Sequence, residues 1–184
     1  GAIDASSIQT ITGSIADINI AYASNGITGL GDEAITLNDS TITATALNTL
    51  DTAINGAIDA SSVLTITGSI ADINTAYASN GITGLDSAAV TISDSTITAS
   101  ALNTLDTATN GDIDASSVTT ITGSIDDINK VYESKDIKRP AFKSWTKLIG
   151  TDDMDFARSL TTGSDGSIYV GGITYGDLEE QTNN

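Results

Sequence analysis

Residues 66–84 read ITGSIADINTAYASNGITG, and residues 11–29 read ITGSIADINIAYASNGITG, so the two stretches differ at a single position. They belong to a 55-residue repeat that recurs without insertions. Residues 1–55 and 56–110 are identical at 44 of 55 positions, and a third copy begins at Gly111. A period of this length is typical of stacked supersecondary units, and it predicts two structural turns in each sequence repeat.

Each repeat has two halves, which are residues 58–78 and 90–108 in the second copy. Both halves begin with alternating apolar residues and end with apolar residues at helical spacing. In the first half Ile70, Ile73 and Tyr77 stand at i, i+3 and i+7. A change from a period of two to a helical period within one unit predicts a strand followed by a short helix.

The predicted helices have recognisable starts and ends. Ser69 is placed to cap a free backbone N–H, and Asp72 is placed to bond back to the start of the helix and to interact with its dipole. The glycine of Asn80-Gly81 is expected to adopt positive φ and to end the helix. The same residues recur in the other copies as Ser14/Asp17, Ser124/Asp127 and Asn25-Gly26.

Neither a strand nor a helix of this length is stable alone, so we expect the copies to stack on one another. The predicted fold class is a β-rich α/β repeat solenoid. The stretch VTISDSTITASALNTL (90–105) is similar to leucine-rich repeats, and that resemblance implies layers of a strand and a short helix. The alternative is a right-handed parallel β-helix, with a third strand in place of the helix, which the many Thr and Ser residues favour.

The sequence changes character near Arg139–Pro140, where the only proline follows two cations. We therefore expect a tandem-repeat domain over residues 1–139, divided into 1–55, 56–110 and a partial copy at 111–139, and a separate segment over 140–184. Residues 142–181 resemble one unit of the SBBP-type β-propeller repeat. The matching features are Trp145-Thr146-Lys147, the turn Asp165-Gly166-Ser167 and the strand at 168–172. The resemblance implies an all-β, blade-like segment that is incomplete by itself.

Together, these 55-residue repeats and the unit that follows them resemble very large secreted or cell-surface tandem-repeat proteins of bacteria, of the cyanobacterial type. The resemblance implies an extracellular location and a structural or adhesive role. It supplies no enzymatic activity.

The distribution of charge excludes several classes of partner. The net charge is −17, and the stretch 1–129 carries fifteen acidic side chains and no Lys or Arg. Such a surface repels phosphate groups, so we expect no nucleic-acid binding and no direct binding to anionic membranes. The chain has no Cys, which excludes disulfides, and no His, which removes the usual acid–base catalyst at neutral pH. We therefore predict that it is not an enzyme and has no organic cofactor.

Calcium is the one ion that the composition favours, because clustered carboxylates supply the hard oxygen ligands that Ca²⁺ prefers. The candidate ligands form two groups, Asp32, Glu33 and Asp39 in the first repeat and Asp152, Asp153 and Asp155 after the repeats. Most other acids recur at expected cap and turn positions, where a local structural role is the simpler interpretation. Tyr22, Tyr77 and Tyr132 recur once per repeat, and they fit either a covering helix face or a stacking ladder for a glycan.

The sequence thus predicts a non-enzymatic, extracellular structural segment, such as a stalk, a spacer or a fibre subunit of a larger protein. One alternative is an adhesin module that depends on calcium or binds carbohydrate. A second is a filament subunit that assembles by complementation of edge strands. The expected partners are other copies of the chain or other segments of the same surface protein.

Overall fold

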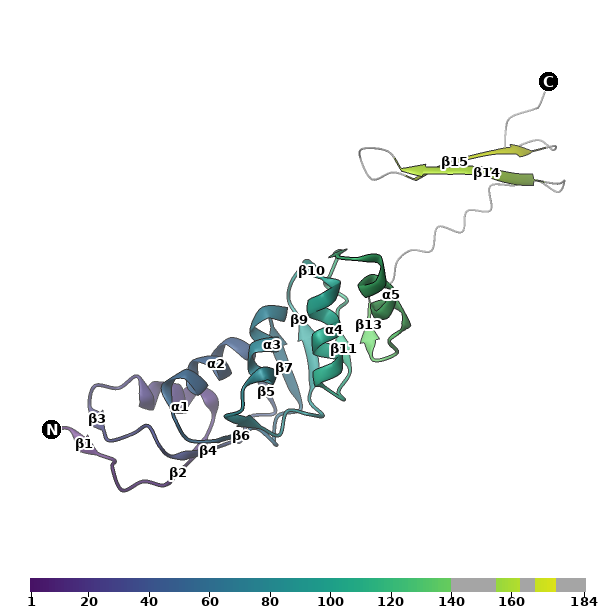
Figure 1. Ribbon diagram of the computed structural model, residues 1–184. Coiled ribbons are helices and arrows are strands. Elements are labelled where there is room, and N and C mark those ends of the chain that lie inside the picture. The colour runs from purple at the N-terminus through teal and green to yellow at the C-terminus, as the bar shows by residue number, and fades with distance from the viewer. Residues whose placement is uncertain (140–154, 163–167, 175–184) are drawn as a thin grey trace. The chain divides into compact units, whose positions relative to one another are not determined.

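The computed structural model describes residues 1–139, 155–162 and 168–174. By backbone contacts the chain divides into two units, Gly1–Phe142 and Lys143–Asn184, and the division falls three residues beyond the expected boundary. The described part of the first unit contains five helices, which follow one another as a row in Figure 1. They are α1 (Ile15–Tyr22), α2 (Ala44–Ala53), α3 (Ile70–Ala78), α4 (Ala99–Ala108) and α5 (Ile125–Glu133).

The helices close two kinds of coil, which alternate along the chain. A short coil has two strands before its helix, and a long coil has three. The short coils contain β1 (Ile3–Asp4), β2 (Thr10–Gly13) and α1; β6 (Ile58–Asp59), β7 (Thr65–Gly68) and α3; and β11 (Ile113–Asp114), β12 (Thr120–Thr122) and α5. The long coils contain β3 (Ile27–Thr28), β4 (Ala34–Leu37), β5 (Thr41–Thr43) and α2; and β8 (Ile82–Thr83), β9 (Ala89–Ile92), β10 (Thr96–Thr98) and α4. Strand β13 (Ile137–Lys138) follows the last short coil.

Every described strand pair in this unit is parallel and joins neighbouring coils. Ile42 pairs with Ile66, and Ile66 pairs with Val90. The next step of the same sheet leads from Val90 to Ile113 and is one position shorter. The number of residues between successive helix starts, in contrast, alternates. It is larger from a short coil to the next long coil than from a long coil to the next short coil. The pairing distance is therefore less than half of the 55-residue sequence repeat.

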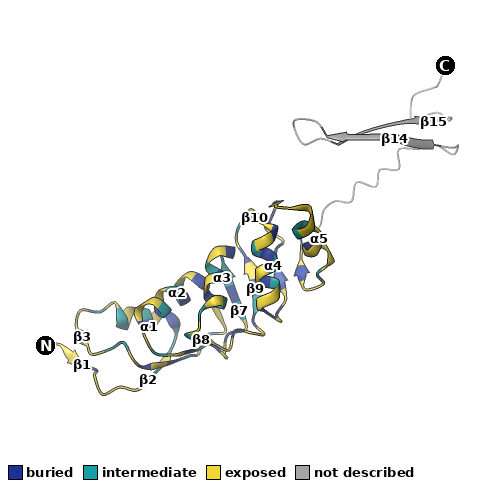
Figure 2. Cartoon of the chain, in the orientation of Figure 1, coloured by how far each residue is buried: buried dark blue, intermediate teal, exposed yellow. Residues whose placement is uncertain are grey.

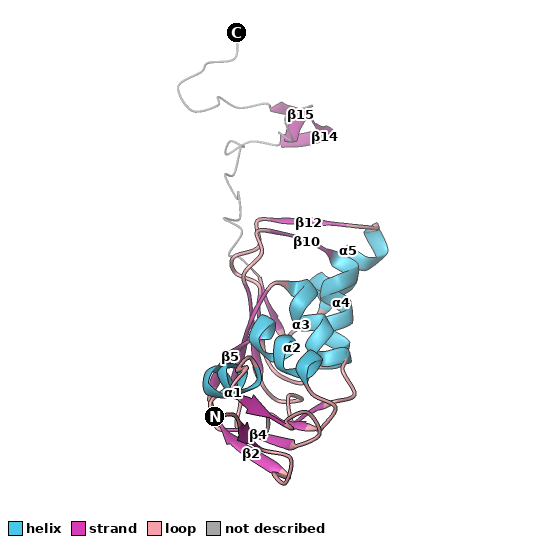
Figure 3. Cartoon of the chain, turned by 90° about the vertical axis from the view of Figure 1, so that its left-hand side faces the viewer, coloured by secondary structure: helices cyan, strands magenta, loops and turns pink. Residues whose placement is uncertain are grey.

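This difference staggers the strands. The five-stranded sheet has the order β13-β11-β9-β7-β5. Followed along the chain, it runs from β5, the third strand of a long coil, to β11 and β13, the first strands of later coils. The four-stranded sheet β2-β4-β6-β8 is staggered in the same direction. The extra strand of each long coil thus shifts the pairing sideways by one strand in every sequence repeat. Figure 3 shows helices α2–α5 side by side, away from strands β2 and β4.

The core is built from aliphatic residues that repeat in register between the strands and the helices. Ile58, Ile66, Leu102 and Leu105 are fully buried, and Figure 2 shows the buried residues along the inside of the coils. Burial of one such side chain stabilises the fold by about 1.5–3 kcal/mol. Because these residues come from successive coils, each coil buries its apolar face only against its neighbours.

The predicted helix starts are confirmed. Ser14, Ser69 and Ser124 are N-caps whose hydroxyl oxygens accept from the third helical N–H, and the hydroxyl of each donates to the following Asp carboxylate. The helices also confirm the strand–helix alternation, whereas the β-helix alternative required strands at these positions.

The predicted helix end is wrong in one respect, because Gly26 and Gly81 are not among the positive-φ glycines. Positive φ falls three residues later, at Gly29 (81°) and Gly84 (85°). A Cβ on Gly84 would lie 2.6 Å from the backbone nitrogen of Ser61 in the preceding coil, so both conformation and space require glycine there. At Gly81 the constraint is weaker, since an added Cβ would lie 2.7 Å from a carboxylate oxygen of Asp51, a side chain that can move away.

The second unit is described only as a β-hairpin. Strands β14 (Asp155–Thr162) and β15 (Ile168–Thr174) pair in antiparallel fashion, with an irregularity between Ala157 and Ser159. The hairpin agrees with the strand predicted at 168–172. The predicted turn at 165–167 and the strand expected at 145–147 lie outside the described residues.

Candidate functional site

A row of asparagines joins the helices to one another. The side-chain amides of Asn19, Asn48, Asn74 and Asn103 donate to backbone carbonyls of the next helix at distances of 2.9–3.1 Å. Each asparagine is the fifth residue of its helix, and each acceptor is the third residue of the following one, namely Ala46, Asp72, Ala101 and Asp127. We call this set the asparagine row. It fixes the position of each helix along its neighbour, in short and long coils alike.

The repeated acids have structural partners, and two of the four sets act between coils. Asp39 and Asp94 accept from the first helical N–H of the preceding coil, Ile15 and Ile70, at 2.7 and 2.6 Å. Asp51 accepts from Ser79 in the next coil at 2.9 Å, as Asp106 does from Ser134. Negative charge at a helix N-terminus is stabilising, so the Asp39 and Asp94 carboxylates strengthen the stack.

The other two sets make their recurrent hydrogen bonds within their own coil, and Asp72 and Asp114 also accept from Thr45 and Lys138 of neighbouring coils. Asp17, Asp72 and Asp127 accept from the N-cap serines, as described above. Asp4, Asp59 and Asp114 accept from the backbone N–H two residues on, which closes the turn after the first strand. The side-chain and then the backbone hydrogen bond from Ser61 lower the pKa of Asp59, and the Ser116 side chain, Lys138 and the Ser116 N–H lower the pKa of Asp114 to about 2. The acids of these four sets are thus engaged by protein donors.

Glu33 occupies a site that the sequence suggested for a metal but that the structure fills with protein donors. Its side chain is only 3% exposed. One of its carboxylate oxygens accepts from the Tyr22 hydroxyl and from the Gly31 N–H, both at 2.7 Å. Burial acts to raise the pKa of Glu33, but these hydrogen bonds outweigh it and the pKa is lowered. Burial and the neighbouring carboxylate raise the pKa of Tyr22.

The second repeat keeps the tyrosine hydroxyl bonded without a carboxylate. Ala88 replaces Glu33, and Thr109 replaces Ile54 at a position that is 8% exposed in both copies. The hydroxyl of Tyr77 lies within hydrogen-bond distance of the Thr109 hydroxyl at 3.3 Å and of the Leu85 carbonyl at 3.2 Å. Two substitutions between the copies therefore compensate each other, because a buried hydroxyl needs a polar partner.

The three candidate calcium ligands of the first repeat, which lie in the described residues, each bind a different protein donor. Asp32 accepts from the Asn55 side chain, Glu33 is enclosed with Tyr22, and Asp39 caps α1. No group of three or more acidic side chains in the described residues is placed to hold a metal ion. Asp152 and Asp153 lie outside the described residues, and Asp155 begins β14 with its side chain undescribed.

The recurrent tyrosines lie on helices α1, α3 and α5. Tyr22 and Tyr77 pack against the buried core. Tyr132 is 49% exposed in the last coil, and the Arg139 guanidinium carbon lies 4.7 Å from its ring centre. The first two tyrosines thus serve as a covering helix face, and their hydroxyls point to buried partners.

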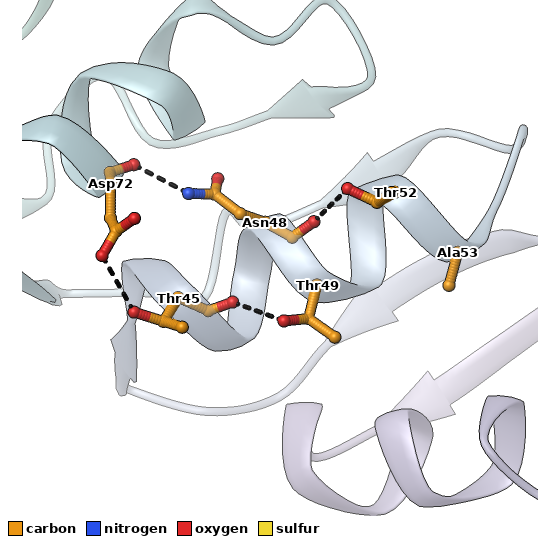
Figure 4. A pocket seen from close by; sticks show the side chains of 6 residues that line it. All are labelled: Thr45, Asn48, Thr49, Thr52, Ala53 and Asp72. Atoms are coloured by element: carbon orange, nitrogen blue, oxygen red, sulfur yellow. Dashed lines mark hydrogen bonds between the residues drawn. The ribbon is translucent and has the colours of Figure 1, made fainter.

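Two equivalent hollows lie on the helical side. The first has a volume of about 440 Å³ and is lined by α2 and Asp72 of α3, as Figure 4 shows. The second, about 410 Å³, is lined by the corresponding residues of α4 and α5. Their lining residues stand one sequence repeat apart: Thr45, Asn48, Thr49, Thr52, Ala53 and Asp72 in one, and Ser100, Asn103, Thr104, Thr107, Ala108 and Asp127 in the other.

Comparison with known proteins finds no match to a protein-family model, to a curated protein or to a solved structure. Within the described ranges, no helix has the length and apolar character needed to cross a membrane.

The asparagine row predicts which asparagine supports the fold. Asn74→Ala removes the bond to the Ala101 carbonyl and should lower the free energy of unfolding by about 1 kcal/mol in urea titrations. Asn129 is the matched control, because it is the fifth residue of α5 but its side-chain amide makes no hydrogen bond to the described residues. Asn129→Ala should change stability by less than about 0.5 kcal/mol. Equal effects of the two substitutions would contradict a role for the row.

The buried carboxylate predicts a pH-dependent contribution to stability. A lowered pKa means that ionised Glu33 stabilises the fold above its unfolded pKa of about 4.3, and that this stabilisation is lost as pH falls through the folded pKa. Glu33→Gln should cost about 1–3 kcal/mol at pH 7 and less at pH 3, measured by chemical denaturation.

The matched control for Glu33→Gln is Thr109→Val, which removes the neutral partner of Tyr77 in the second repeat. Its effect on the free energy of unfolding should be the same at both pH values. A cost of Glu33→Gln that is equally constant would show that folding does not lower the pKa of Glu33.

Proposed function

We propose that this chain is a passive structural segment: an α/β solenoid with leucine-rich-repeat-like layers that acts as a spacer, stalk or fibre subunit of a larger extracellular protein. The observation that carries the proposal is that the same kinds of contact recur between neighbouring coils. The asparagine row and the parallel strand pairs are found at successive interfaces. Length can therefore grow by whole repeats without a new kind of contact.

The chemistry of the described surface supports a passive role. The acidic side chains of the repeat accept hydrogen bonds from caps and turns, and the protein has no histidine. Net negative charge keeps neighbouring molecules apart and soluble. The extracellular location rests on the resemblance to bacterial surface proteins and on the absence of cysteine and of basic residues before Lys130.

Self-assembly into a filament is a second candidate, because the end coils expose residues that interior coils bury. Ile3 is 63% exposed, whereas Ile58, at the same place in the next repeat, is fully buried. Ile125 in the last helix is 70% exposed, whereas its counterpart Ile70 is 8% exposed. Apolar residues of this kind are buried when a further layer of the same repeat covers them, and in a filament another copy of the chain supplies that layer.

A change in repeat number tests the spacer function. Deletion of residues 56–110 joins Asn55 to Gly111 and recreates the Asn-Gly junction found at both natural boundaries. Duplication of the same residues extends the chain by one repeat. Free energy of unfolding and longest dimension by X-ray scattering should both rise stepwise from the shortened to the natural to the lengthened chain, in chelator as well as in calcium.

The same samples separate the alternatives. A molecular mass that rises with protein concentration would favour the filament. Folding that requires millimolar calcium would favour the adhesin. A lengthened chain with unchanged dimension and stability would contradict the spacer.

A further inference from the structure

The α2–α3 hollow has the wrong chemistry for an anionic ligand or for one that only accepts hydrogen bonds, because its hydroxyl protons are already used. Thr45 donates to an Asp72 carboxylate oxygen at 3.1 Å, and Thr49 and Thr52 donate to the carbonyls of Thr45 and Asn48 at 2.8 Å. Figure 4 shows these bonds. The hydroxyl oxygens keep unshared electron pairs, so the threonines can still accept hydrogen bonds. The hollow therefore favours a ligand that donates.

One carboxylate oxygen of Asp72 in the hollow can still accept a hydrogen bond from a ligand. Ser69 and Thr45 both donate to the Oδ2 atom of Asp72, at 2.9 and 3.1 Å, and no described residue donates to Oδ1. A guanidinium binds best when it meets both oxygens of a carboxylate, whereas an ammonium is a compact charge that needs only one. The geometry thus favours a lysine-type head group over an arginine-type one.

The rest of the hollow suits an aliphatic stem. Ala53 and the threonines of α2 line it with methyl groups beside the oxygen atoms. Lysine side chains commonly lay their methylene groups on apolar surface while the charge reaches polar atoms. The surrounding field is favourable as well, since the chain has no Lys or Arg before Lys130.

The equivalent hollow between α4 and α5 already has a lysine beside its carboxylate. Lys130 lies 3.6 Å from Asp127, which corresponds to Asp72, and this contact contributes to the lowered pKa of Asp127 after the larger effect of Ser124. The residue that corresponds to Lys130 in the second repeat is Thr75. The chain therefore supplies an ammonium at one of the two hollows and none at the other.

We propose that the α2–α3 hollow is a binding site for a lysine side chain of a basic polypeptide. The ammonium group donates to Asp72 Oδ1 and to the hydroxyl oxygens of α2, and the stem covers Ala53. Lys130 already lies beside the corresponding carboxylate, Asp127, so the α4–α5 hollow binds the same partner more weakly. The site is independent of whether the whole chain acts as a spacer.

Nuclear magnetic resonance titration of the full chain tests the proposal, with a trilysine peptide as the probe at low salt. We expect shifts of the Thr49, Thr52 and Asp72 resonances and smaller shifts of Thr104, Thr107 and Asp127. Thr75→Lys copies the third repeat and should reduce the shifts in the α2–α3 hollow to the size of those in the α4–α5 hollow. Lys130→Thr copies the second repeat and should make the α4–α5 hollow respond as strongly as the first.

Three comparisons make the test decisive. Asp72→Asn should weaken trilysine binding about two- to five-fold, as expected for one partly exposed charge pair. Asp86→Asn removes the same charge outside the hollow and should leave the local shifts unchanged. The proposal is overturned if Asp86→Asn has an equal effect, if triarginine or spermidine binds the hollow more tightly than trilysine, or if the two substitutions at 75 and 130 move no resonances. Each variant is measured at both hollows, so a misfolded sample is recognised by its spectrum. If Thr75→Lys misfolds, Thr75→Arg takes its place.

Discussion

Hydrogen bonds between neighbouring coils, from both backbone and side chains, are the interaction on which this structure depends. The strands of the repeat are two to four residues long and the helices eight to ten, lengths at which neither is stable in water. Their free N–H and C=O groups find partners on the neighbouring coil: strand on strand, Asp39 on the start of α1, and Asn19 on a carbonyl of α2. Stability is therefore a property of the interfaces between coils.

The alternation of long and short coils follows from one additional strand. Strands β5 and β10 occur only in the long coils, and each pairs with the second strand of the next short coil. Stacking thus stays continuous while the pairing moves sideways by one strand in each repeat. For this reason, paired strand residues can be separated by less than half of the repeat length in a chain whose sequence repeats every 55 residues. The exposed threonines of one repeat are consequently shifted sideways from those of the next, so they do not form one continuous flat surface.

Much of this architecture can be predicted from the sequence, because the signals are local. The serine caps, the change from alternation to helical spacing and the 55-residue period lead to five helices and parallel strands. Contacts between coils are harder to predict. Asn48 and Asp72, or Asp39 and Ile15, are partners from different coils, and the register that joins them depends on the extra strand. Their one visible signal is an asparagine at the fifth position of every helix.

The candidate site shows the same limit. The cluster of Asp32, Glu33 and Asp39 suggests calcium when it is read along the chain, but the fold directs the three side chains to three different protein donors. Only the structure shows that Glu33 replaces Thr109 as the partner of a buried tyrosine. The acceptor-rich hollow on α2 is equally invisible in the sequence, since it depends on which hydroxyl protons are already donated.

Cysteine cross-linking tests the central claim, the half-repeat register of the strands, most directly, because the protein has no cysteine of its own. Thr41 and Thr65 are partners on adjacent parallel strands, whereas Thr41 and Thr96 stand one sequence repeat apart. Neighbouring strands lie about 4.8 Å apart, within the range of a disulfide. The account predicts that Thr41→Cys with Thr65→Cys oxidises readily to an intramolecular disulfide, and that Thr41→Cys with Thr96→Cys does not. Preferential closure of the second pair would show that whole 55-residue repeats, and not half-repeats, are the stacked units.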